Sequence, residues 1–168
     1  MKITDTGILE ISLKIEREGG EFYNKLAEHV ADPKIKEFLL HLAKDEAQHE
    51  KQFKKMLREK GSSLYGWEKK KAIHKLIESQ FQTDIFPKVN EIFARLPNFQ
   101  GIQKAIDFAI EAERTSAEFY SLLGEFCDNI KAKTLLVMME KAERDHLTQV
   151  LALKKQYLHD SRKKSKSS

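Results

Sequence analysis

Residues 16–23 of the chain read EREGGEFY, and residues 113–120 read ERTSAEFY. A second pair of related segments follows at the same offset of 97 residues, with EAQH at 46–49 and ERDH at 143–146. Between residues 16 and 52 the comparison needs no gap, and 14 of 37 positions are identical to their counterparts. A repeat of this length predicts that the chain folds as two copies of one structural unit.

Each repeat unit has the pattern of a pair of helices. Apolar residues recur at helical spacing through four long stretches, about 5–31, 33–61, 98–126 and 130–159. The second stretch opens with Asp32 and Pro33, a capping residue followed by a residue preorganised for the first helical turn. Residues 61–97 interrupt the pattern, and we expect them to form a long crossover containing one or two short helices. The predicted fold is therefore all-α, a four-helix bundle of two repeated hairpins in up-down-down-up order, spanning residues 1–160.

Composition narrows the class of protein. The 168 residues include only 7 glycines and 3 prolines, which favours long helices over fibrous or disordered classes. One cysteine excludes an intramolecular disulfide and a cysteine-only metal site. We find no apolar run long enough for a membrane span and no signal-peptide core, so a cytoplasmic location is expected.

The net charge of +4 first suggests an anionic partner. The basic excess lies in residues 51–71 and 154–168, however, and elsewhere 23 acidic residues outnumber 16 basic ones. Residues 161–168 are basic and are expected to form a disordered tail. Nucleic-acid binding is therefore not the favoured interpretation, although a metal-free helical scaffold that binds nucleic acid remains an alternative.

The Glu-x-x-His segments indicate metal chemistry. Residues three apart share one face of a helix, so a Glu oxygen and the following His nitrogen can reach the same ion. One such pair is weak support, but two pairs at the repeat offset, each with a matched Glu on the preceding helix, form the donor set of a dinuclear carboxylate site. The matched residues are Glu16, Glu46, His49, Glu113, Glu143 and His146. Oxygen and imidazole donors suit iron or manganese, and zinc is also compatible.

Two tyrosines repeat with these ligands. Tyr23 and Tyr120 follow Glu16 and Glu113 by seven residues, which places them on the same helix face. Because a buried phenol needs a hydrogen-bond partner, we interpret them as donors to ligand carboxylates, with an ordinary core position as the alternative.

The constellation resembles the ferritin-like di-iron proteins, and the Glu-Phe-Tyr placement resembles the rubrerythrins in particular. The resemblance covers roughly residues 8–155. It implies two iron ions, with Glu16 and Glu113 as terminal ligands, Glu46 and Glu143 as bridges, and the two histidines completing the coordination. It also implies an oxidoreductase of oxidative-stress type that reduces hydrogen peroxide or dioxygen. An iron-binding protein or ferroxidase, in which iron is the substrate, is the alternative.

Two features depart from the rubrerythrin pattern. Rubrerythrins usually carry a cysteine-rich rubredoxin domain, which one cysteine cannot build, so a separate electron-donor protein is expected. They also tend to carry an extra Glu one turn after the third-helix ligand, where this chain has Ser116, paired in the repeat with Gly19.

A homodimer is expected, and the sequence leaves open whether helices exchange between its protomers.

Overall fold

The computed structural model of this protein describes residues 4–58, 65–81 and 85–166, all of them in helices, turns or short connections. The four long helices are α1 (Asp5–His29), α2 (Pro33–Arg58), α5 (Asn98–Glu125) and α6 (Ile130–Lys166). Three short elements lie between the hairpins: the 3₁₀ turn η1 (Trp67–Lys69), α3 (Lys71–Gln80) and α4 (Val89–Arg95). The prediction of an all-α bundle made of two hairpins and a long crossover is confirmed.

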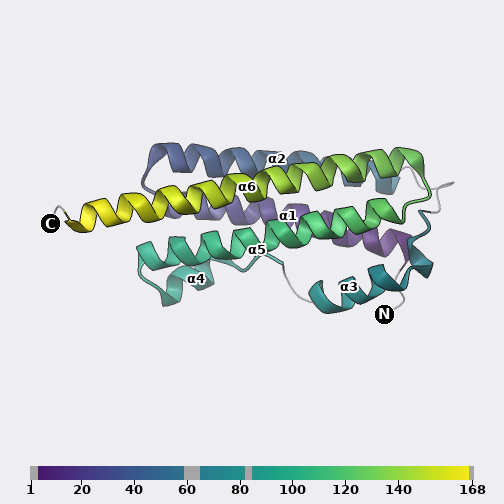
Figure 1. The fold of residues 1–168 in the computed structure, drawn as a ribbon, viewed down its shortest axis with the longest axis horizontal. Helices are drawn as coiled ribbons and strands as arrows, with labels where there is room; N and C mark the ends of the chain where they lie inside the picture. Colours follow the sequence, from purple (N-terminus) through teal and green to yellow (C-terminus); the bar gives the residue numbers. More distant parts are fainter. Residues whose placement is uncertain (1–3, 59–64, 82–84, 167–168) are drawn as a thin grey trace.

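The helices are arranged in the expected up-down-down-up order. In Figure 1, α1 and α6 run toward one end of the bundle, and α2 and α5 run toward the other. The crossover makes this order necessary, because it carries the chain from the end of α2 back to the opposite end of the bundle before α5 begins. The two hairpins therefore present equivalent helices to each other across the bundle.

Local sequence explains where the helices begin. The Asp32 side chain accepts hydrogen bonds from the backbone N–H groups of Lys34 and Ile35, at 2.9 and 3.1 Å, as the capping prediction required. Asn129 plays the same part at the start of α6, where its side-chain oxygen accepts from the Ala132 N–H at 2.9 Å.

The far end of α6 differs from the prediction. The helix was expected to end near residue 159 and to be followed by a disordered tail from 161, but its backbone remains helical to residue 166. The prediction is therefore wrong for residues 161–166, while 167–168 lie outside the described residues. Residues 130–166 contain no glycine or proline, so nothing in the backbone chemistry stops the helix. The expected end of the second helix near residue 61 also lies outside the described residues.

The crossover packs against α1 and α5, the first helix of each hairpin. The Trp67 indole N–H donates to a backbone carbonyl near the end of α5 at 3.0 Å. Farther along, the ring of Phe81 lies 4.5 Å from that of Phe119 on α5, and the ring of Phe86 lies 5.2 Å from that of Phe22 on α1, measured between centroids. The crossover thus covers the side of the bundle formed by α1 and α5, and its short helices confirm the expectation for residues 61–97 within its described parts.

The apolar core has two halves. One contains Phe22, Leu39 and Ile106, and the other contains Phe53 and Phe119. Between them, halfway along the bundle, the four long helices contribute a layer of buried charged side chains. Burial of such groups is costly unless they are paired or bind metal, so this layer is where a function is to be sought.

None of the described helices combines the length and the apolar character that a membrane span requires.

Candidate metal centre

The buried polar layer consists of the six residues that the repeat singled out. Each long helix places its residues of this layer at the same height in the bundle, and every one of these residues is at most 8% exposed. The residues are Glu16 on α1, Glu46 and His49 on α2, Glu113 on α5, and Glu143 and His146 on α6.

The six side chains form two overlapping groups. One group contains Glu16, Glu46, His49 and Glu143, and the other contains Glu46, Glu113, Glu143 and His146. Within each group one donor atom from every residue lies within 4.8 Å of the others. The two groups share Glu46 and Glu143, which are therefore in position to serve two ions at once. The assignment of bridging and terminal ligands stays a prediction. It requires two glutamates that belong to both groups, and Glu46 and Glu143 have that position.

Both histidines turn the same ring nitrogen toward the carboxylates. The Nδ1 atom of His49 lies 3.1 Å from Glu16, 3.2 Å from Glu46 and 3.3 Å from Glu143. The Nδ1 atom of His146 lies 3.1 Å from Glu46. Since each histidine reaches carboxylates of other helices, Nδ1 is the atom that each would offer to a metal.

Charge and burial shift the pKa values strongly within this cluster. Burial raises the pKa of Glu16 to about 8, and the nearby His49 only partly offsets this. Burial and repulsion from Glu46 and Glu16 raise the pKa of Glu143 well above its usual value. For Glu46, burial acts in the same direction, but the attraction of the two histidines prevails and lowers its pKa to about 2. Burial would lower the pKa of His146, yet the surrounding carboxylates raise it to about 11. In the metal-free cluster, protons on the carboxyl and imidazole groups therefore reduce the repulsion between the glutamates, as metal ions would in the loaded site.

Several polar atoms of the cluster lack a hydrogen-bond partner among the described residues. They are Oε1 of Glu46, Oε2 of Glu113, Oε1 of Glu143 and Nδ1 of His146. Although the Glu46 and His146 atoms of this set lie close together, they do not form a hydrogen bond of acceptable geometry. Buried polar atoms are normally satisfied, so orphaned oxygens and a nitrogen that converge on one place fit metal coordination.

The two tyrosines tie the hairpins together through this cluster. The Tyr23 hydroxyl on α1 donates to Oε1 of Glu113 on α5, and the Tyr120 hydroxyl on α5 donates to Oε1 of Glu16 on α1. Each tyrosine therefore serves the carboxylate of the opposite hairpin. Burial and the neighbouring carboxylates raise both tyrosine pKa values, so the phenols keep their protons and act as donors. These are the two hydrogen bonds that the sequence interpretation requires, and the role of the two carboxylates as metal ligands stays a prediction.

Asp45 on α2 makes a contact across the bundle that the repeat does not indicate. Its carboxylate lies 3.5 Å from Nε2 of His146, the ring nitrogen that faces away from the cluster. A carboxylate in this place fixes the ring orientation of a metal-binding histidine. The repeat comparison could not find it, because the counterpart of Asp45 in the second unit is Ala142.

Gly19 and Gly20 lie where α1 approaches α2 at the cluster, and they differ in the room they leave for a side chain. A Cβ atom at Gly20 would lie 3.6 Å from the Cβ of Glu46, an ordinary contact. At Gly19 it would lie 3.3 Å from Cγ of Glu46 and 3.2 Å from the ring of Phe86 on the crossover. The absence of a side chain at residue 19 therefore lets the crossover reach the wall of the cluster.

A four-helix bundle that places glutamates and two Glu-x-x-His pairs in its interior defines the class of ferritin-like carboxylate proteins. The sequence model of the rubrerythrin family matches residues 7–154. The chain belongs to the rubrerythrin family. The 168 residues contain one cysteine, so they do not form the four-cysteine site of a rubredoxin domain.

Solved structures share this fold. A candidate ferritin-like diiron-carboxylate protein of Thermotoga maritima is 24% identical, with a TM-score of 0.69 over 92% of this chain and 96% of that one. A hypothetical protein of Pyrococcus furiosus is also 24% identical, with a TM-score of 0.67 over 92% of this chain and 90% of the other. No curated protein matches the chain significantly.

Proposed function

We propose that this protein holds two iron ions between Glu16, Glu46, His49, Glu113, Glu143 and His146 and reduces hydrogen peroxide or dioxygen with electrons from a separate donor protein. The single observation that carries the proposal is the pair of overlapping donor groups that share Glu46 and Glu143. Family membership and the fold support iron as the metal, with manganese or zinc as the competing ions.

When bound, the reduced metal pair would supply the two electrons that convert hydrogen peroxide and two protons into two water molecules. The chain's own residues provide the setting. Four carboxylates balance the charge of two divalent ions, and the buried layer between two apolar half-cores excludes bulk water. Tyr23 and Tyr120 hold the Glu113 and Glu16 carboxylates from the opposite hairpin, which limits how far either can swing.

Anaerobic loading with ferrous iron, followed by metal analysis, tests the site. We expect about two ions per chain for a dinuclear carboxylate site. Glu46→Ala and Glu143→Ala should each lose dinuclear binding, because either change removes a donor from both groups. Glu118→Ala, at an exposed position on α5, is the matched control and should load normally. Wild-type protein that takes up no iron would refute the proposed centre.

Stopped-flow oxidation of the ferrous protein tests the reaction. Faster oxidation by hydrogen peroxide than by dioxygen would identify a peroxidase, and the reverse order would identify an oxidase. Continued consumption of ferrous iron beyond two ions per chain would instead identify iron as the substrate and favour the ferroxidase alternative. Sedimentation of the same samples would test the expected homodimer.

A further inference from the structure

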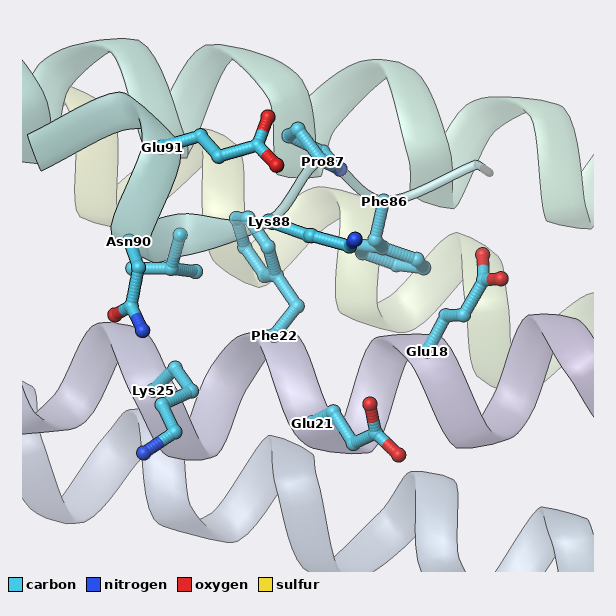
Figure 2. Close-up of a pocket in the computed structure, with 10 residues that line it drawn as sticks. Glu18, Glu21, Phe22, Lys25, Phe86, Pro87, Lys88, Asn90 and Glu91 are labelled. Carbon is cyan, nitrogen blue, oxygen red and sulfur yellow. The ribbon is translucent and has the colours of Figure 1, made fainter. Parts of the chain in front are cut away.

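A pocket of about 390 Å³ lies between α1 and the crossover, on the α1 side of the bundle. Figure 2 shows Phe22 of α1 and Phe86 and Pro87 of the crossover bordering it, with Lys88 extended across it and the carboxylates of Glu18 and Glu21 nearby. The pocket has an apolar floor and a rim that carries charges of both signs. A rim of this kind neither repels nor strongly retains a small uncharged molecule.

Phe86 separates this pocket from the metal cluster. Its ring lines the pocket and also packs beside Gly19, where an added Cβ atom would lie only 3.2 Å from the ring and 3.3 Å from Cγ of Glu46. The ring centroid lies 6.0 Å from that of Tyr23, whose hydroxyl donates to Glu113. One buried aromatic ring, 5% exposed, therefore lines the pocket and also packs on Tyr23 beside the cluster.

The backbone that carries this ring is held in place. The N–H of Ile85 donates to Oε2 of Glu18 at 3.0 Å, and Pro87 restricts the backbone on the other side of Phe86. Movement of the ring about its side-chain bonds is therefore the simplest way to open a passage from the pocket. Such a passage is narrow, because the ring remains in contact with Phe22 and Tyr23.

We infer that this pocket is the route by which a small uncharged oxidant reaches the metal centre, and that Phe86 is the specificity-determining residue that excludes larger hydroperoxides and chelators. The inference rests on the proposed function for its oxidant. Hydrogen peroxide passes the ring, and an alkyl hydroperoxide of the size of tert-butyl hydroperoxide does not.

The test compares three proteins loaded anaerobically with ferrous iron: wild type, Phe86→Ala and Phe81→Ala. Phe81 is the matched control, since it is a buried crossover phenylalanine, 9% exposed, that packs on Phe119 as Phe86 packs on Phe22. In Phe86→Ala we expect oxidation by tert-butyl hydroperoxide to accelerate about tenfold or more, the scale on which apolar pockets discriminate by size, while the hydrogen peroxide rate changes less than about twofold. Phe81→Ala should keep the wild-type ratio of the two rates.

A second readout does not depend on turnover. Removal of ferrous iron by 2,2′-bipyridyl should accelerate about tenfold in Phe86→Ala and remain unchanged in Phe81→Ala. Phe86→Leu, which keeps more of the apolar volume, should show a smaller change in the same direction and serves as the test if Phe86→Ala fails to fold.

The outcomes separate the two proposals. Protein that loads iron but shows equal size selectivity in wild type and the Phe86 variants overturns the inference alone. Equal acceleration in Phe81→Ala also overturns it, because the effect would then be a general loosening of the crossover. Failure to take up iron overturns the proposed function at the loading step, and this inference with it.

Discussion

The hydrogen bond from Tyr23 to Glu113 offers a direct test of how the two hairpins are joined. Tyr23→Phe removes only the hydroxyl and leaves the Glu113 carboxylate without its donor from α1. A hydrogen bond to a charged group contributes about 1.5–3 kcal/mol, and the contact is fully buried, so we expect the unfolding free energy of the metal-free protein to fall by about 2 kcal/mol. For a chain of 168 residues this corresponds to a decrease in Tm of about 4–8 °C.

The assay is thermal and urea unfolding of metal-free wild type, Tyr23→Phe, Tyr120→Phe and the double variant. Tyr120 makes the mirror contact with Glu16, so the single variants should lose similar amounts. The double variant should deviate from additivity, because both bonds end on one charged cluster. Thr148→Val, which removes an exposed hydroxyl that donates to a backbone carbonyl of its own helix, is the control and should change Tm by less than about 2 °C.

Metal binding gives a second measurement of the same bonds. If the tyrosines hold ligand carboxylates, each single variant should also weaken ferrous-iron affinity by about 10- to 100-fold. The raised tyrosine pKa values keep the phenols protonated, so both remain hydrogen-bond donors from neutral to mildly alkaline pH. A Tyr23→Phe protein within about 0.5 kcal/mol of wild type, with unchanged metal affinity, would refute the reasoning.

Three further predictions follow from the cluster and its walls. Gly20→Ala should stabilise the protein by about 0.5–1 kcal/mol in urea unfolding, because alanine favours the helix and its methyl group meets only ordinary contacts. Gly19→Ala should be at least about 1 kcal/mol less stable than Gly20→Ala, because its methyl group requires the ring of Phe86 to shift. Equal stability of the two variants would contradict the close approach at residue 19. Asp45→Asn should weaken ferrous-iron affinity about 10-fold or more in a competition titration, while Asp145→Asn, at an exposed position, should not. In the metal-free protein the pKa of Glu16 is raised to about 8, so the folded state holds a proton that the unfolded state has released, and Tm should fall as pH rises from about 5 to about 8. The gain in Tm on adding metal should grow over the same range, because metal and protons compete for the same carboxylates, and a Tm gain independent of pH would count against this assignment.

Much of the fold could be predicted from the chain, and the errors have physical causes. The helix starts at residues 33 and 130 follow from local capping chemistry, which needs only neighbouring residues. The end of α6 was misplaced because a basic, apolar-poor segment was interpreted as disordered, although it lacks any residue that breaks a helix. Composition describes whether a segment can build a core, and it does not decide whether an existing helix continues.

Some residues of the candidate site could likewise be identified from the sequence, and others could not. The repeat identified all six ligand-type residues, because matched Glu and His positions are visible in sequence without knowledge of the packing. Asp45 and Phe86 were not identified as parts of the site. Neither has a matching partner in the second unit, and both reach the cluster through contacts with distant segments of the chain.

The sequence by itself determined the two-hairpin bundle and the donor set, since both depend on helical spacing and on a repeat of 97 residues. Only the tertiary structure decided which carboxylates belong to both donor groups, that each tyrosine serves the opposite hairpin, and that one crossover ring lines the pocket beside the cluster. The reason is geometric. Helical periodicity fixes which residues share a face, whereas the distances between faces arise from how helices pack, and small residues such as Gly19 set that approach.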